Sequence, residues 1–292
     1  MEIKSRNRPE DAQILQLREL EKSCRLRDGQ TTPIPLNTWM NFNPGMKSCF
    51  LLYAGERLVS FLNVFAPEAR EAEVYAVTHP EFRRRGYFAA LLREAEAELK
   101  RCGVSRILLV CEKMSRDGQE TARRLGGRLQ HSEYRLKFEG APETAPPGRL
   151  RLEEAGPGDL KAISALDVRI FGSDPEVSLS MLGKTLEDPK NRTFSVFLGE
   201  KRIGLCNAGL REDGISIFGL GIAPEHQGMG YGRDMLLLLL GKLREYPGRD
   251  ITLEADSENQ AALRLYRSSG FTEITRFDYY EYISRGSGKD GI

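Results

Sequence analysis

The most informative segment of this chain is glycine-rich and reads Gln227-Gly228-Met229-Gly230-Tyr231-Gly232. Pro224 and an apolar run over residues 215–222 precede it, and a long helical pattern follows it. The chain therefore leaves a strand, makes a glycine-rich turn and enters a helix at its N-terminus. Free backbone N–H groups and the helix dipole make such a turn suitable for binding a phosphate. The alternative interpretation of the glycine spacing is a tight helix cap that binds no ligand.

The same pattern of residues occurs about half the chain length earlier. Residues 80–88 align with residues 224–232 without a gap and match at the Pro, Glu, Gly and Tyr positions. The first copy is basic, and its candidate phosphate-binding residues are Arg83, Arg85 and Gly86. Alternatively, these arginines lie on the solvent-exposed surface and bind no ligand. A repeat of this length indicates domain duplication, because solenoid repeats have much shorter periods.

Composition excludes several classes of protein. With 292 residues, 40% of them hydrophobic, the chain can form two domains that each bury a core. The net charge of +1 argues against a nucleic-acid partner, since proteins that track a phosphate backbone carry a basic excess. Five cysteines without metal-ligand spacing are typical of reduced thiols in a cytoplasmic protein with no metal site. No apolar segment is long enough for a secretory signal or a membrane span, so no membrane partner is expected. The oligomeric state stays open.

The pattern of elements predicts two domains of the α/β (α+β) class. Strand and helix patterns alternate over residues 1–140 and restart in the same order over residues 150–292. Residues 141–149 contain three prolines and Gly148, and Gly140 directly precedes them. This segment is therefore predicted to be a semi-stiff linker.

Two other phosphate-binding loops are excluded. The dinucleotide fingerprint needs a third glycine, but Gly228-x-Gly230 is followed by Arg233 and Gly219-x-Gly221 by Pro224. The P-loop needs Gly-Lys followed by Ser or Thr with a glycine five residues upstream. Its nearest match, residues 183–185, has Ser178 at that upstream position.

Two further segments extend the turn into a family resemblance. The turn is followed, at a set spacing, by Leu253-Glu254-Ala255-Asp256-Ser257-Glu258-Asn259 and by Ala261-Ala262-x-x-Leu265-Tyr266-x-x-x-Gly270-Phe271. Together they resemble the acyl-CoA-binding turn, strand and helix of the GNAT superfamily of N-acyltransferases. The resemblance covers the second half well and the first half more weakly, through Arg83-x-x-Gly86. Tandem bacterial members, the mycothiol synthases among them, have a similar layout. The resemblance implies two GNAT-like domains, each a mixed, largely antiparallel sheet with splayed central parallel strands flanked by helices.

The resemblance also implies a cofactor site for acetyl-CoA, as co-substrate and without a metal. The diphosphate would lie on the turn and the pantetheine arm between splayed strands over residues 215–222 and 251–255. Asn259 would contact pantetheine or cap the helix that follows. The implied cofactor-binding residues of this half are Leu220, Gly221, Ile222, Gln227, Gly228, Met229, Gly230, Tyr231, Gly232, Arg233 and Asn259.

In this family an amine attacks the thioester directly. Tyr266 occupies the position of the general acid that protonates the departing thiolate, with a packed, non-catalytic aromatic as the alternative. The general base is open among Glu254, Asp256, Glu225 and His226, of which the last two are expected to face solvent, and a water chain is a further alternative. Glu254 is taken as the catalytic candidate.

The first half departs from the family pattern. Phe88 stands where a small residue is expected, and Arg123 stands four residues before Gly127, as Tyr266 stands before Gly270. We therefore predict a degenerate first domain, whose binding of CoA stays open. The second domain is predicted to be an N-acetyltransferase acting on a small-molecule or peptide amine. The alternative is a non-catalytic acyl-CoA-binding or scaffolding protein. Acidic and aromatic residues over 171–181 and 278–282 are compatible with a pocket for a cationic amine.

Overall fold

The computed structural model describes residues 1–140, 148–212, 214–246 and 248–283. These residues pack as two compact units. The N-terminal unit comprises residues 1–132 together with the chain from Thr275 onward, and the C-terminal unit comprises Glu133–Ile274. The predicted linker falls largely on residues 141–147, which lie outside the described residues.

The N-terminal unit is built on a mixed sheet with strand order β1-β2-β3-β4-β5-β12. Neighbouring strands are antiparallel except for β4 and β5, which are parallel. The strands are β1 (Glu2–Arg6), β2 (Cys49–Ala54), β3 (Arg57–Phe65), β4 (Glu71–Thr78), β5 (Arg106–Glu112) and β12 (Phe271–Tyr282). The helices are α1 (Asp11–Asp28), α2 (Tyr87–Arg101) and α3 (Arg116–Arg124), with short 3-10 turns at Thr38–Met40 and Pro80–Phe82.

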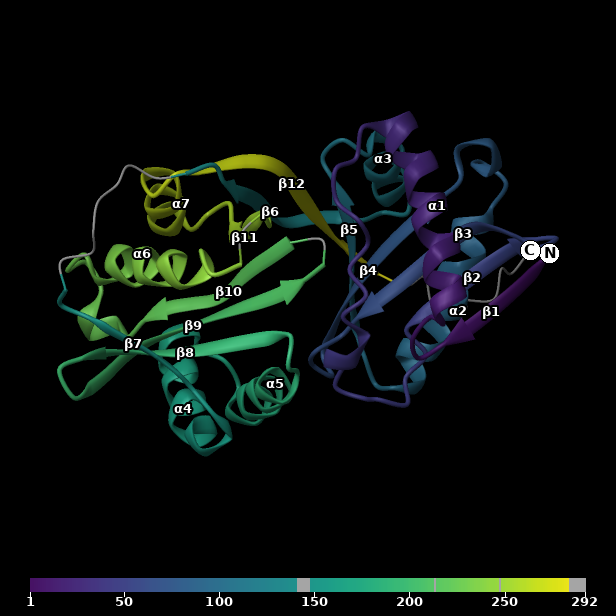
Figure 1. The fold of residues 1–292 in the computed structure, drawn as a ribbon. Coiled ribbons are helices and arrows are strands. Elements are labelled where there is room, and N and C mark those ends of the chain that lie inside the picture. Colours follow the sequence, from purple (N-terminus) through teal and green to yellow (C-terminus); the bar gives the residue numbers. More distant parts are fainter. Residues whose placement is uncertain (141–147, 213, 247, 284–292) are drawn as a thin grey trace. The chain divides into compact units, whose positions relative to one another are not determined.

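Helices cover both faces of this sheet (Figure 1). Because successive strand residues point to opposite faces, Leu51 packs in one apolar cluster with Leu17 of α1, and Phe50 in another with Leu91 of α2. All of these side chains are almost fully buried. The alternation therefore makes a three-layer unit with β4 and β5 in its middle layer.

The C-terminal unit repeats this plan with strand order β6-β11-β10-β9-β8-β7. Its strands are β6 (Arg128–Phe138), β7 (Arg151–Glu154), β8 (Asn191–Leu198), β9 (Lys201–Arg211), β10 (Gly214–Ile222) and β11 (Ile251–Asp256). Only β10 and β11 run parallel. Its helices are α4 (Leu160–Phe171), α5 (Pro175–Glu187), α6 (Tyr231–Leu243) and α7 (Gln260–Ser268), with 3-10 turns at Pro157–Asp159 and Pro224–His226. In Figure 1, α6 and α7 cover one face of this sheet and α4 and α5 the other.

Helix α5 is the one helix that the sequence pattern did not predict. Its start is fixed locally, because the Asp174 carboxylate accepts hydrogen bonds from the N–H groups of Glu176 and Val177, and Pro175 stands at the first helical position. The Asp-Pro pair was the signal available in the sequence. The corresponding part of the N-terminal half, around Trp39, forms an irregular segment with a single 3-10 turn.

The last strands of the two halves are exchanged. Residues Glu133 to Lys137 of β6 pair with Asp256 to Thr252 of β11 in the C-terminal unit. Residues Phe277 to Tyr282 of β12 pair with Glu112 to Ile107 of β5 in the N-terminal unit. Each unit is therefore completed by a strand from the other half of the chain, a division that differs from the ranges 1–140 and 150–292.

The duplication is visible in the backbone. Glycines with positive φ recur 143 or 144 residues apart, in the pairs Gly29 and Gly172, Gly55 and Gly199, Gly86 and Gly230, and Gly126 and Gly270. The last two pairs mark the start of the helix after each turn and the end of the later helix. They supply a register for comparing the two units residue by residue.

Candidate active site

The central parallel strands of the C-terminal unit separate along their length. β10 pairs with β11 only from Ile215 to Ile217, opposite Ile251 to Leu253. β10 then continues to Ile222, while β11 continues along β6 to Asp256. The family's splayed strands are therefore present. A gap between strands leaves backbone groups without ladder partners, so it can accept an extended amide-containing chain.

A β-bulge in β10 lies at this gap. The register with β9 shifts by one residue between Phe218 and Gly221, and Gly219 adopts φ of +55°. A Cβ on Gly219 would lie 2.7 Å from Nδ2 of Asn207, which donates a hydrogen bond to the Phe218 carbonyl at 3.3 Å. Bulges turn backbone groups out of the ladder and recur beside active sites. Gly219 and Asn207 are thus site residues that the sequence reasoning missed, although the glycine had been noticed in rejecting a dinucleotide motif.

The end of α4 packs against β10 just beyond the bulge. A Cβ on Gly221 would lie 2.8 Å from Cζ of Phe171, so only glycine fits under this helix end. Leu220 is half-buried and Ile222 is buried. The three predicted residues on β10 therefore lie together at the open end of the gap.

The glycine-rich turn carries free donors. Gly228 and Gly230 have φ of +75° and +83°, and Gly230 is the N-cap of α6. Among the described residues, no acceptor contacts the backbone N–H groups of residues 228–232. Each hydrogen bond from such a group to a charged oxygen contributes about 1.5–3 kcal/mol, so the turn fits an anionic diphosphate.

Side chains of the turn have distinct roles. Nε2 of Gln227 donates to the carbonyl of Ile222 at 2.9 Å, which fixes the exit from β10. Gly232 faces α7, and a Cβ there would make an ordinary contact, 3.5 Å from Cδ2 of Leu265. Met229 is half exposed, and Arg233 is exposed with no carboxylate partner in the described part of the chain. Arg233 is thus available to an anion at the turn.

Tyr266 and Asn259 lie on or next to α7, which follows β11. Tyr266 is 7% exposed, its ring centroid lies 6.1 Å from that of Phe271, and no described residue hydrogen-bonds to its hydroxyl. Burial raises the pKa of this phenol, which therefore stays protonated and can act as an acid. Oδ1 of Asn259 accepts from the N–H of Ala262 at 3.0 Å, so the helix-capping role is observed. No described residue accepts a hydrogen bond from its amide nitrogen.

Glu254 lies on β11 beside the gap and opposite Arg135. Its side chain is 47% exposed, and its carboxylate lies 3.7 Å from the guanidinium. Partial desolvation by the surrounding chain raises the pKa of Glu254. The positive charge of Arg135 opposes this rise, and the negative charge of Glu133 adds to it. A carboxylate that reaches solvent and has a raised pKa suits a general base better than one with an ordinary pKa.

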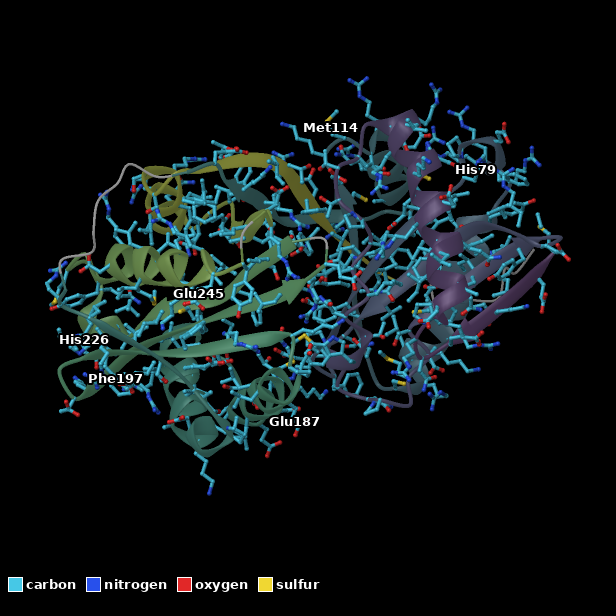
Figure 2. The ribbon with its side chains drawn as sticks, viewed as in Figure 1. His79, Met114, Glu187, Phe197, His226 and Glu245 are labelled. Carbon is cyan, nitrogen blue, oxygen red and sulfur yellow. The ribbon has the colours of Figure 1, made fainter. Side chains whose placement is uncertain are left out.

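The other base candidates have different surroundings. Glu225 pairs with Arg169 at 2.5 Å and with Lys201 at 3.6 Å on the surface, and the hydrogen bonds it accepts lower its pKa. His226, labelled in Figure 2, lies at the turn before α6 with its ring against Tyr231. Asp256 accepts a hydrogen bond from the N–H of Glu258 at 2.7 Å. Glu254 and Asp256 both lie on β11 beyond its pairing with β10, and the Asp256 carboxylate already holds the N–H of Glu258.

The N-terminal turn has the backbone conformation of the C-terminal turn but lacks several of the side-chain features that would bind a phosphate. Gly86 has φ of +77°, and Arg84 holds φ of +60° at the place of Gly228. Arg83 donates to the Thr78 carbonyl, as Gln227 does to Ile222, but its guanidinium also pairs with Asp28 at 2.5 Å and with Asp117 at 3.0 Å. Its positive charge is therefore already neutralised. Arg85 is exposed and lies over the ring of Phe82, while Phe88 packs against the core of its unit.

β4 and α3 also differ from their C-terminal counterparts. The pairing of β4 with β3 shows no register shift, so the bulge is missing. Gly126 has φ of +85° at the end of α3, matching Gly270 at +91° after α7. The match of Arg123 to Tyr266 was therefore wrong by one residue, because the left-handed glycine is Gly126 and not Gly127. Ala122, 1% exposed, takes the place of Tyr266, and the conclusion that this half has no tyrosine there is unchanged.

The predicted acceptor residues 278–282 belong to the other unit. They pair with β5, where Asp278 is 2% exposed and accepts from Ser132 at 2.7 Å. The hydroxyl of Tyr280 accepts from Arg123 at 3.1 Å. The strand exchange thus carries these residues into the N-terminal sheet, and their part in an acceptor pocket stays a prediction.

The described residues contain no cluster of three or more His, Cys, Asp or Glu side chains arranged to hold a metal ion. None of the helices in the described ranges combines the length and apolar character needed to cross a bilayer.

The pattern of the Acetyltransferase (GNAT) family matches the chain twice, over residues 14–126 and 161–271. The chain belongs to this family. It is thus an acyl-CoA-dependent N-acetyltransferase of the tandem type, with two GNAT domains, as the two turns predicted. Members of the family use acetyl-CoA as co-substrate.

Relatives of this acetyltransferase match either the whole chain or about half of it. It is 28% identical over 279 residues to the mycothiol acetyltransferase of Thermomonospora curvata, covering 90% of this chain and 91% of that one. Over 139 residues it is 31% identical to the N-alpha-acetyltransferase RimI of Mycobacterium tuberculosis, covering 45% of this chain and 82% of the relative. The predicted likeness in layout to mycothiol synthases is in keeping with the first of these.

Solved structures share the fold. A GCN5-related N-acetyltransferase from Sphaerobacter thermophilus superposes with a TM-score of 0.77 at 20% identity, covering 96% of this chain and 95% of that one. A tandem GNAT protein from the clavulanic acid biosynthesis pathway gives 0.72 at 16% identity, covering 96% and 97%. At these identities the likeness establishes the tandem fold alone.

Proposed function

We propose that the C-terminal unit transfers the acetyl group of acetyl-CoA to an amine by direct attack. One observation carries this assignment: the splayed strands, the bulge at Gly219, the free amides of the turn and Tyr266 occur together in this unit. The N-terminal unit has the strand pair and the turn but lacks the bulge and the tyrosine, and its Arg83 is paired with two carboxylates.

The residues of the site fit the chemistry of this transfer. Acetyl-CoA supplies an activated thioester. The N–H groups of residues 228–232 would hold its diphosphate, and the backbone of Leu220 to Ile222 would pair with pantetheine in the gap. Glu254 would accept a proton from the amine as its nitrogen bonds to the carbonyl carbon. As the carbon–sulfur bond breaks, Tyr266 would give its proton to the sulfur, and backbone N–H groups released by the bulge would stabilise the oxyanion.

A matched pair of turn substitutions tests which unit works. Gly230→Glu and Gly86→Glu place the same side chain at equivalent backbone positions, with φ of +83° and +77°. Gly230→Glu removes favourable contacts and adds repulsion at the diphosphate, so acetyl-CoA affinity is expected to fall about 100-fold or more. Gly86→Glu is expected to leave thiol release nearly unchanged. The measurement is thiol release from acetyl-CoA with a panel of amines, with circular dichroism to verify folding.

The reverse pattern would assign activity to the N-terminal unit. Stabilisation by CoA without thiol release above background for any amine would favour the non-catalytic binding or scaffolding protein.

The pH profile tests Glu254. A base works in its deprotonated form, so kcat/KM is expected to rise with pH through the raised pKa of Glu254. Glu254→Gln is expected to lower kcat by about 10²-fold or more and to remove this acidic limb. Asp256→Asn, two residues along the same strand, is the matched control and is expected to keep the limb. An unchanged acidic limb in Glu254→Gln would point to a water chain instead.

The remaining assignments follow from the same site. The acceptor is proposed to be a small-molecule or peptide amine, and the N-terminal unit is proposed to be a degenerate copy. All five cysteines are free thiols, four of them buried, which supports the proposal of a cytoplasmic enzyme.

A further inference from the structure

We propose that Arg149 is a phosphate-binding residue of the cofactor site and that Asp234 holds it in position; this rests on the proposed binding of acetyl-CoA by the C-terminal unit. Arg149 precedes β7 and is no part of the glycine-rich turn in the sequence. Its role arises from where its side chain lies.

The guanidinium of Arg149 lies directly on the turn. Its Nη2 is 3.3 Å from where a Cβ on Gly230 would be, and its Nη1 donates to the carbonyl of Met229 at 3.4 Å. The same group lies over the ring of Tyr231, 5.0 Å from the centroid. A fixed positive charge is thereby held beside the free N–H groups of the turn.

Asp234 anchors this charge from the first turn of α6. Its carboxylate, in a side chain that is 6% exposed, accepts from Nε of Arg149 at 3.0 Å and from Nη2 at 2.6 Å. Two donors on one oxygen fix the plane of the guanidinium. Nη1 makes one long hydrogen bond and retains donor capacity, and 43% of the side chain is exposed at the rim of the turn.

The charges explain why the site needs such a residue. A buried carboxylate at the start of α6 would by itself repel the diphosphate that the helix end attracts. Arg149 cancels that charge and can also donate to a phosphate oxygen. These are separable roles, because neutralisation needs Asp234 to be charged whereas direct binding does not.

Arg151 supplies a matched control. It lies two residues further along, is 47% exposed, and is held by Glu153 and by the Gly199 carbonyl away from the turn. Loss of this arginine removes the same charge two residues away. A nonspecific effect of net charge would therefore appear in both variants.

The test is the affinity of the full-length protein for CoA, dephospho-CoA and pantetheine, measured by titration calorimetry. Arg149→Gln is expected to weaken CoA binding about 10- to 100-fold and to leave pantetheine binding unchanged, because pantetheine has no phosphate. It is expected to raise KM for acetyl-CoA without changing kcat. Arg149→Lys should retain part of the affinity, and Arg151→Gln should behave as wild type. An equal loss with dephospho-CoA assigns the contact to the diphosphate, and a loss confined to CoA assigns it to the 3′-phosphate.

The double variant Arg149→Gln/Asp234→Asn separates binding from neutralisation. If Arg149 contacts phosphate, this variant binds CoA about 10- to 100-fold more weakly than Asp234→Asn alone. Equal affinity of these two variants would overturn the proposal and leave Arg149 as a neutralising partner. So would wild-type CoA affinity in Arg149→Gln, or an equal loss of pantetheine binding. A wild-type protein that does not bind CoA would instead overturn the proposed function on which this inference rests.

Discussion

Tyr266→Phe is expected to lower kcat by about 10²- to 10⁴-fold and to leave the affinity for acetyl-CoA nearly unchanged. The substitution removes one hydroxyl from a side chain that is 7% exposed and keeps the ring packed against Phe271. The hydroxyl has no hydrogen-bonding partner among the described residues, so no native contact is lost. The thiolate would then leave without a proton donor, whereas binding of the diphosphate and pantetheine is untouched.

Stopped-flow thiol release and CoA titration measure these two quantities separately. Tyr246→Phe is the control, because Tyr246 packs against the same apolar cluster and lies outside β10, β11 and α7. A Tyr266→Phe enzyme with wild-type kcat would make Tyr266 a packed aromatic and return the role of acid to water. A fall in unfolding temperature together with activity would indicate a structural effect instead.

The second large effect is expected from cutting the chain at its predicted domain boundary. The fragment 150–292 lacks residues 133–138, so β11 loses its antiparallel partner and the core loses Tyr134, Leu136 and Phe138. Each large apolar side chain that leaves the core costs about 1.5–3 kcal/mol, and a whole domain is stable by only about 5–15 kcal/mol. We therefore expect the fragment 150–292 to be unfolded or aggregated.

The fragment 133–274 is the matched comparison, because it contains the whole compact unit, including residues 133–138 of β6. It is expected to fold and to bind acetyl-CoA. Co-expression of 1–140 with 150–292 is expected to recover soluble protein, since the first fragment supplies β6 and the second supplies β12. Because neither fragment contains Arg149, thiol release is expected only at saturating acetyl-CoA. Soluble yield, circular dichroism and thiol release are the measurements. If 150–292 alone folds and binds acetyl-CoA as well as 133–274 does, the strand exchange is dispensable.

The two turns show how one backbone supports different chemistry. Their glycines Gly86 and Gly230 share φ within a few degrees, and Arg83 and Gln227 make the same hydrogen bond to the end of the preceding strand. The difference lies in surrounding groups: Asp28 and Asp117 neutralise the N-terminal arginine, whereas Asp234 positions Arg149 at the C-terminal turn. A turn motif therefore predicts the backbone conformation of the turn, and the charged groups around it decide which ligand it accepts.

Local signals in the sequence determined the elements, the duplication, the turn and the family. Glycine spacing, an Asn cap and apolar periodicity act over a few residues, and the structure contains each of them. The candidate positions of Tyr266 and Glu254 followed from the motif, and the structure adds burial of the phenol and a raised pKa for the carboxylate.

Only the tertiary structure decided the strand exchange, the bulge at Gly219 and the position of Arg149. Each depends on contacts between segments far apart in the chain: β6 with β11, Asn207 with β10, and Arg149 with α6. The strand exchange could not be predicted, because the sequence pattern of an edge strand fits the edge of either sheet. The bulge could not be predicted either, because it needs only one extra residue in a strand whose sequence pattern is otherwise regular. Local sequence sets which elements form, whereas long-range packing sets which of their groups meet.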